Sequence, residues 1–143
     1  MKAHTILIAL ALLLFASQAL AHETQTIGAP GEEYDVIVGF STEPPFTDER
    51  NGLSLTVRRS GEGEPVENLQ NSLSAQLIGP DGQATLELEL RPRHGQPGSY
   101  TDDFVLTQPG VYTLRLSGFI GTAEVDLTFE LHEVRPLDEL RFP

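Results

Sequence analysis

Apolar and polar residues alternate along most of the chain after residue 33, which is the spacing of β-strands rather than of helices. Each alternating segment would present one apolar and one polar face. No long segment has the three- and four-residue apolar spacing of an amphipathic helix. We therefore expect seven strands, within residues 34–40, 53–57, 73–77, 86–90, 100–106, 112–116 and 125–131.

Proline and glycine cluster between these segments, for example in Gly79-Pro80-Asp81-Gly82 and Gln108-Pro109-Gly110. Proline fixes φ and glycine accepts positive φ, so both residues end strands and reverse the chain. Short strands with regular turns and one polar face each favour two antiparallel sheets around a shared core. The predicted fold is all-β, a seven-stranded antiparallel immunoglobulin-like β-sandwich over residues 33–134.

Two residues allow more local predictions. Tyr112 opens a strand directly after a Pro-Gly turn, which indicates a tyrosine corner, in which the hydroxyl bonds to nearby backbone. The alternative is that Tyr112 is simply a core aromatic residue. Asp102 shares the parity of Tyr100 and Phe104, so it either faces inward, where it needs a partner such as an arginine, or marks an irregularity of the strand.

Residues 1–21 have the layout of a secretory signal peptide. Lys2 precedes an apolar run from Ile6 to Phe15, and Ala19-Leu20-Ala21 forms a small-x-small cleavage site. An apolar run of this length is about half of what a transmembrane helix needs. Cleavage after Ala21 would make His22 the N-terminus, whereas cleavage after Ala19 would leave two more residues before it. We expect a periplasmic or secreted protein with no transmembrane segment in the mature chain.

The mature chain would be strongly acidic. It would carry eight arginines and 21 aspartates and glutamates, which is a formal charge of −13. This charge disfavours nucleic acid and anionic lipid as partners. The chain has no cysteine and therefore no disulfide. Its length suits one domain, which we divide into a flexible leader (22–32), the sandwich (33–134) and a C-terminal tail (135–143).

Several short motifs occur in a fixed order along this domain. They are Ala-His-Glu at the cleavage site, Val38-Gly39-Phe40 followed by Glu43-Pro44-Pro45, Asn51-Gly52, Gly63-Glu64-Pro65-Val66, Gly95-Gln96-Pro97-Gly98-Ser99-Tyr100, and Gln108-Pro109-Gly110-Val111-Tyr112-Thr113. In this order the chain resembles small exported bacterial immunoglobulin-like proteins of the YtkA-like and CopC-like group. The resemblance covers nearly all of the mature chain. It implies a sandwich fold, and other proteins of the group are associated with periplasmic copper.

This chain lacks the methionine-rich segments that handle Cu(I) in related proteins, because Met1 is its only methionine. A Cu(II) or Zn(II) site built from nitrogen and oxygen ligands remains open. The mature chain has three histidines. His132 has the outward parity of the last strand, so we expect it to be a solvated surface residue near the opposite pole from His22.

His94 lies in the 93–98 loop, which a seven-strand sandwich places at the pole where the first strand begins. The α-amino group and imidazole of His22 can form a chelate, and His94 would add a third nitrogen. This arrangement is a histidine brace, which suits Cu(II). The predicted metal ligands are therefore His22 and His94. The alternative is that one is a leader residue and the other an exposed loop residue, with no metal between them.

No serine stands in a recognised arrangement with histidine and carboxylate, so the sequence gives no support for hydrolysis. We predict an exported non-catalytic binding protein that takes Cu(II) through His22. The alternative is a structural or protein-interaction sandwich of the cell envelope that binds a protein partner and no metal. A histidine-brace copper monooxygenase is a more remote alternative, because the chain has three tyrosines and no tryptophan for a flat sugar-binding surface.

Overall fold

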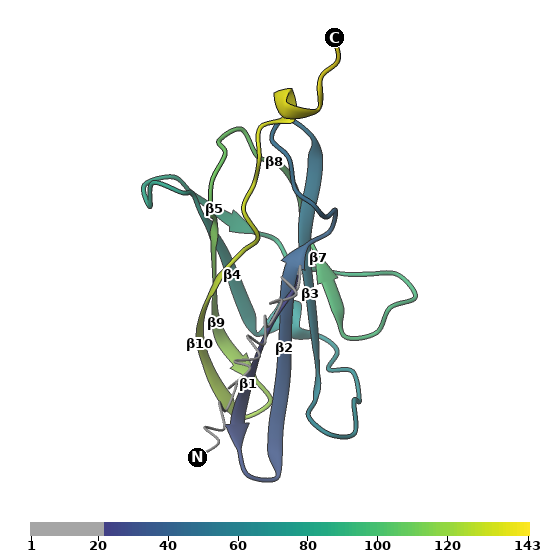
Figure 1. Cartoon of the computed structure of the whole chain (residues 1–143). Coiled ribbons are helices and arrows are strands. Elements are labelled where there is room, and N and C mark those ends of the chain that lie inside the picture. Colours follow the sequence, from purple (N-terminus) through teal and green to yellow (C-terminus); the bar gives the residue numbers. More distant parts are fainter. Residues whose placement is uncertain (1–21) are drawn as a thin grey trace, which may run out of the picture.

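Two antiparallel sheets face each other across one apolar core (Figure 1). The structure is a computed structural model, and it describes residues 22–143. The larger sheet has the order β1-β2-β3-β7-β6, and β8 also pairs with β3; the smaller sheet has the order β10-β9-β4-β5. The strands are β1 (Glu23–Ala29), β2 (Glu32–Phe40), β3 (Arg50–Arg59), β4 (Leu73–Ile78), β5 (Thr85–Leu88), β6 (Arg91–Pro92), β7 (Ser99–Thr101), β8 (Asp103–Val105), β9 (Thr113–Ile120) and β10 (Ala123–Glu130).

The predicted all-β immunoglobulin-like sandwich is confirmed, with a different strand count. Each of the seven alternating segments overlaps a strand of the structure. The segment 100–106 is divided into β7 and β8, and two further strands, β1 and β6, had no apolar alternation to reveal them. Two short 3₁₀ turns, at Leu69–Asn71 and Leu137–Leu140, are the helical elements of residues 22–143. None of the described helices is long and apolar enough to span a membrane.

The core forms where the apolar faces of the two sheets meet. Val36, Val38, Leu55, Leu114 and Leu116 have no exposed surface, and they come from β2 and β3 on one side and from β9 on the other. Burying a side chain of this size contributes about 1.5–3 kcal/mol. The other large side chains with less than 2 % exposure are Phe40, Leu53, Val57, Tyr100, Ile120, Phe129 and Val134.

The prediction of a flexible leader over residues 22–32 is wrong. Glu23–Ala29 is strand β1, and it pairs with β2 from Glu23 opposite Val38 to Ala29 opposite Glu32. Gly28 and Gly31 take positive φ at the reversal between the two strands, a conformation that glycine accepts readily. Ile27 packs against the core, and the Gln25 side chain donates a hydrogen bond to the Thr128 carbonyl of β10. Backbone pairing therefore orders a segment that has a single large apolar residue.

Asp102 marks a strand irregularity, which is one of the two alternatives that its parity left open. It separates β7 from β8, and its carbonyl accepts the N–H of Leu53. Its carboxylate accepts the Glu89 N–H at 2.8 Å and lies 3.6 Å from an Arg91 guanidinium nitrogen. A Cβ on Gly52 would lie only 2.5 Å from the Asp102 carbonyl oxygen, so the glycine permits this close approach. At this interruption, the Asp102 carboxylate links the larger sheet to the segment that crosses from β5 to β6.

Two buried tyrosines fix turns through their hydroxyl groups. The Tyr112 hydroxyl donates to the Gln108 carbonyl at 2.7 Å, which confirms the predicted tyrosine corner. The Tyr100 hydroxyl makes two bonds: it donates to the Val66 carbonyl at 2.6 Å and accepts the Leu69 N–H at 3.2 Å. Burial raises the pKa of both phenols. Tyr100 thereby holds the connection between β3 and β4.

We expect Tyr100→Phe to be more destabilising than Tyr112→Phe. The first change leaves two backbone groups without their partner and the second leaves one, and each unpaired buried group costs about 1–3 kcal/mol. Urea unfolding of both variants measures the difference. An equal or smaller loss of stability in Tyr100→Phe would contradict this account of the β3 to β4 connection.

Candidate functional site

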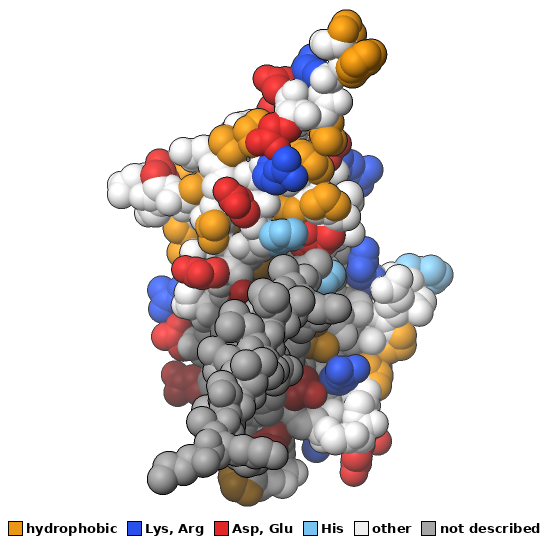
Figure 2. All heavy atoms as spheres, in the orientation of Figure 1, with side chains coloured by type: hydrophobic (Ala, Val, Ile, Leu, Met, Phe, Trp, Pro, Cys, Tyr) orange, Lys and Arg blue, Asp and Glu red, His pale blue; other side chains and the backbone are white. Residues whose placement is uncertain are grey.

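The structure does not bring His22 and His94 together. His22 immediately precedes β1, at one edge of the larger sheet, and His94 follows β6 at the other edge. Four strand-to-strand steps separate β1 from β6, which at about 4.8 Å each amounts to roughly 19 Å. Figure 2 shows histidine side chains in two separate places, in the middle of the visible face beside acidic groups and on the loop that projects at the right.

The expectation that a shared pole would bring the two histidines together was wrong for a simple reason. Counting strands places a loop at one end or the other along the strand direction, but it does not place the loop across the sheet. The short strand β6, absent from the sequence prediction, puts the 93–98 loop at the far edge. His94 consequently lies beside Arg91 and Arg93 in an open hollow, away from β1.

The imidazole of His22 lies on the backbone of β2. Gly39 is flanked by the buried core residues Val38 and Phe40, so its own position points away from the core. A Cβ on Gly39 would be 2.6 Å from Cδ2, 2.9 Å from Cγ and 2.9 Å from Nε2 of His22. The ring therefore occupies space that only glycine leaves free. The Cδ2 edge of the ring faces Gly39, which leaves Nδ1 on the far side of the ring.

A second histidine is linked through Glu43 to the next residue of β2. His132 Nδ1 is 3.0 Å from Glu43 Oε2, and Glu43 Oε1 accepts the N–H of Phe40 at 3.2 Å. Phe40 follows Gly39 in β2, so the His22 ring and the Glu43–His132 pair contact two consecutive residues. The bond from Gln25 to Thr128 links β1 to β10 just beyond them. This group of His22, Glu43 and His132 is called the edge cluster below.

The edge cluster has a carboxylate in the position that orients a metal-binding histidine. Glu43 is 14 % exposed and fixed by the Phe40 N–H, whereas His132 is 41 % exposed. A carboxylate on Nδ1 fixes the ring orientation and leaves Nε2 free to face a ligand, as in many carboxylate–histidine–metal arrangements. Across residues 22–143, no three histidine, aspartate or glutamate side chains are gathered as a preformed metal site. A site here needs the α-amino group of His22 as a further ligand.

Sequence reasoning missed His132 and Glu43 for different reasons. The parity argument for His132 assumed that the last strand continues through it, but β10 ends at Glu130. Glu43 lies in the turn after β2, where it was noted only as part of a Pro-Pro motif. The signal that could have suggested them is the pairing of a turn carboxylate with a histidine just past a strand end. Their contact follows from the chain after β10 running beside the segment after β2, where Arg135 forms a bridge with Phe46.

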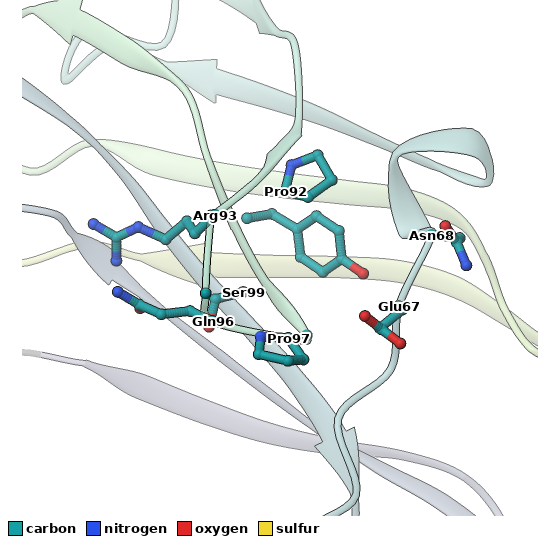
Figure 3. A pocket seen from close by; sticks show the side chains of 10 residues that line it. Glu67, Asn68, Pro92, Arg93, Gln96, Pro97 and Ser99 are labelled. Carbon is teal, nitrogen blue, oxygen red and sulfur yellow. The ribbon is translucent and has the colours of Figure 1, made fainter.

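A small hollow lies beside the 93–98 loop, at the β6 edge of the larger sheet (Figure 3). Pro92 and Pro97 flank it, and Glu67 and Asn68 lie at its far end. Its volume is about 160 Å³, well below the roughly 300–1,000 Å³ of typical ligand pockets. The Tyr100 hydroxyl at this place is already bonded to Val66 and Leu69. The hollow is therefore best explained by the packing of the β3 to β4 connection.

The carboxyl groups with lowered pKa belong to surface hydrogen-bond pairs. Hydrogen bonds from Arg50 and Arg91 lower the pKa of Asp103, and hydrogen bonds from Ser60 and Thr26 lower that of Asp35. Glu32 has a lowered pKa because the Tyr34 hydroxyl and Thr122 donate to it. These carboxyl groups lie on or beside paired strands, and their hydrogen bonds link neighbouring strands.

Comparison with known proteins supports the fold and leaves the function open. No family model matches the chain, and no curated protein matches it. A protein of the DUF4426 family from Pseudomonas aeruginosa PAO1 is similar in structure, with a TM-score of 0.50 and 15% identity over 79% of this chain and 96% of that one. The Lin-41 filamin domain matches with a TM-score of 0.45 and 19% identity over 68% of this chain and 91% of that one. At such identities the likeness concerns the sandwich alone.

We expect Glu43→Ala to loosen the end of β2. The change removes the acceptor of the Phe40 N–H and the partner of His132, and an unpaired amide costs about 1–3 kcal/mol. Hydrogen exchange of the Phe40 amide should become faster. Glu133→Ala is the control, because Glu133 is exposed and adjoins His132 in sequence. Equal protection of Phe40 in both variants would argue against the Glu43 contact.

Proposed function

We propose that the mature protein is an exported, non-catalytic Cu(II)-binding protein whose ligands are His22 and His132, with Glu43 orienting His132. The observation that carries the proposal is the Glu43 carboxylate, which bonds the Phe40 N–H beside His22 through one oxygen and His132 through the other. His132 thus takes the part for which the sequence suggested His94. The proposal depends on cleavage after Ala21, which makes the His22 nitrogen a primary amine.

The position of His22 is fixed by a strand rather than by a mobile leader. Glu23, the next residue, pairs with Val38, and the ring of His22 rests on Gly39. A ligand that is already held near its partner loses little conformational freedom on binding. The Nδ1 atom faces away from Gly39, so it is free to chelate together with the amine. This preorganisation favours a specific metal site over a surface histidine that is not held in a fixed position.

The available donors favour Cu(II) among biological metals. Two imidazoles and an amine give nitrogen ligands of the kind that Cu(II) binds more strongly than other divalent first-row metals. The mature chain offers no cysteine or methionine for Cu(I). Its formal charge of −13 adds a general attraction for cations. The nitrogen donors that hold the copper would come from the residue before β1 and from the segment after β10.

The metal-free alternative, a protein-interaction sandwich of the cell envelope, has its own support in the exposed apolar residues of the structure. Leu86, Val105 and Val111 are each more than 40 % exposed. A sandwich can present such a surface without any metal. The two functions use different parts of the molecule and can coexist.

Copper titration of the protein that begins at His22 tests the proposal. We expect one Cu(II) per chain, with an electron paramagnetic resonance spectrum showing nitrogen ligands. His132→Ala should weaken binding at least about tenfold, because it removes one of the nitrogen ligands. His94→Ala is the matched control and should leave the affinity unchanged, since His94 lies at the opposite sheet edge.

Two outcomes would overturn the assignment. The first is Cu(II) binding that His94→Ala weakens and His132→Ala does not. The second is binding that is indifferent to one additional residue before His22, since that residue converts the amine into an amide. Urea unfolding of each variant confirms that the fold is retained.

Copper affinity should fall as the pH is lowered. The amine and imidazoles bind copper only when deprotonated, and a free α-amino group has a pKa of about 7.7–8.0. Affinity should therefore drop about tenfold per pH unit below the amine pKa, and more steeply where the imidazoles also take up protons. Competition titrations at a series of pH values measure the slope. Acetylation of the amine should remove the step near neutral pH, and its persistence would contradict an amine ligand.

A further inference from the structure

An apolar groove opens between the two sheets on the side away from the edge cluster. It is lined by residues of β4, β5, β8 and the segments that follow β8, and its volume is about 180 Å³. Leu86 and Val105 line it and are 45 % and 56 % exposed. No charged side chain lines the groove, although the chain as a whole is strongly acidic. The lining residues are Leu77, Gly79, Ala84, Thr85, Leu86, Phe104, Val105, Leu106, Thr107, Gln108 and Tyr112.

Both strands that flank the groove have a free backbone edge. β5 is the last strand of the smaller sheet, and β8 has β3 as its one partner among the described strands. Unpaired edges of this kind can accept an added strand, whose backbone supplies hydrogen bonds while its side chains fill adjacent pockets. The groove therefore suits an extended segment with apolar side chains at every second position.

The end of the C-terminal tail has two apolar side chains at this spacing, Leu140 as the last residue of the 3₁₀ turn and Phe142 after it. Leu140 and Phe142 are two residues apart and are 60 % and 97 % exposed, the two most exposed large apolar side chains of residues 22–143. Arg141 between them has extended backbone angles, with φ −71° and ψ 140°. The base of the tail is held by the bridge of Arg135 to Phe46 and by the bond of the Leu137 N–H to Thr47. Beyond this anchor the tail extends away from the body (Figure 1).

Charge also favours the tail as the occupant. Two copies of the chain that begins at His22, each with a formal charge of −13, repel each other. Within residues 135–143, however, Arg135 and Arg141 balance Asp138 and Glu139, with which they form ion pairs. The side chains of the tail thus carry no net charge, although the body is acidic. They add little repulsion when the tail of a second copy approaches an uncharged groove.

We propose that the protein forms a homodimer in which the Leu140–Phe142 end of each copy's tail packs into the β5–β8 groove of the other. Leu140 and Phe142 would point inward against Leu86 and Val105. The exchange is reciprocal, so it closes as a twofold-symmetric dimer and doubles the apolar area that one tail buries. Each tail buries only two large apolar side chains, so the interface is small and the dimer should dissociate on dilution.

Sedimentation equilibrium of the protein that begins at His22, without metal, tests this dimer. We expect a concentration-dependent dimer that becomes tighter as salt is added, because salt screens the repulsion between the acidic bodies. The double variant Leu140→Ser, Phe142→Ser should weaken association about tenfold or more. Leu86→Thr should do the same from the groove side while keeping a good strand former in β5.

Phe119→Ser is the matched control. Phe119 is a 52 % exposed aromatic residue of β9 that does not line the groove, so its loss should leave dimerisation unchanged. Thermal unfolding of the tail variant in dilute, monomeric solution should match that of the parent, because Leu140 and Phe142 are exposed within one chain.

Mixing the two defective variants gives the sharpest measurement. The tail variant retains an intact groove and Leu86→Thr retains an intact tail, so one of the two contacts is restored in the mixed dimer. The heterodimer should be tighter than either variant's homodimer. A monomer at all concentrations and salt levels would overturn the proposal. A dimer that persists in the tail variant would also overturn it. So would a dimer that a foreign extended peptide disrupts while a peptide with the tail sequence does not.

Discussion

The contact on which the rest of the structure depends is the packing of the two sheets' apolar faces. Val36, Val38 and Leu55 on one sheet meet Leu114 and Leu116 on the other with no exposed surface. Apolar burial is the largest favourable contribution to folding, and strands bury one face efficiently only when another sheet covers it. Every feature with a proposed role lies at the margin of this core. The edge cluster lies where β1 and β10 meet, and the groove lies where β5 and β8 part.

The edge cluster exists because a weakly apolar strand pairs onto a strongly apolar one. β1 contributes Ile27 to the core, and its remaining hold is the backbone ladder to β2 together with the bond of Gln25 to Thr128. That ladder brings His22 onto Gly39. The chain past β10 then passes close enough for His132 to reach Glu43. The proposed copper site is thus assembled from three segments that are remote in sequence.

The groove between β5 and β8, on the side away from the edge cluster, also results from how the strands are arranged. The chain leaves the smaller sheet at β5 and enters the larger one at β6, and the Asp102 carboxylate holds the crossing segment through the Glu89 N–H. The same residue interrupts the strand between β7 and β8. Neither sheet therefore closes over the other here, and Leu86 stays partly exposed although it has the parity of buried Leu88. An irregular strand and a crossover together leave two free edges beside an apolar surface.

The sequence by itself determined the sandwich, the main strands and the tyrosine corner at Tyr112, and it offered the irregularity at Asp102 as one of two alternatives. These depend on local alternation and turn chemistry, which are written in neighbouring residues. It could not show that residues 23–29 form a strand, because backbone pairing needs no apolar pattern. It also placed His94 with His22 and set His132 apart. Only the tertiary structure decided these positions, because strand order across a sheet and contact between two sheet edges are set by packing between distant segments.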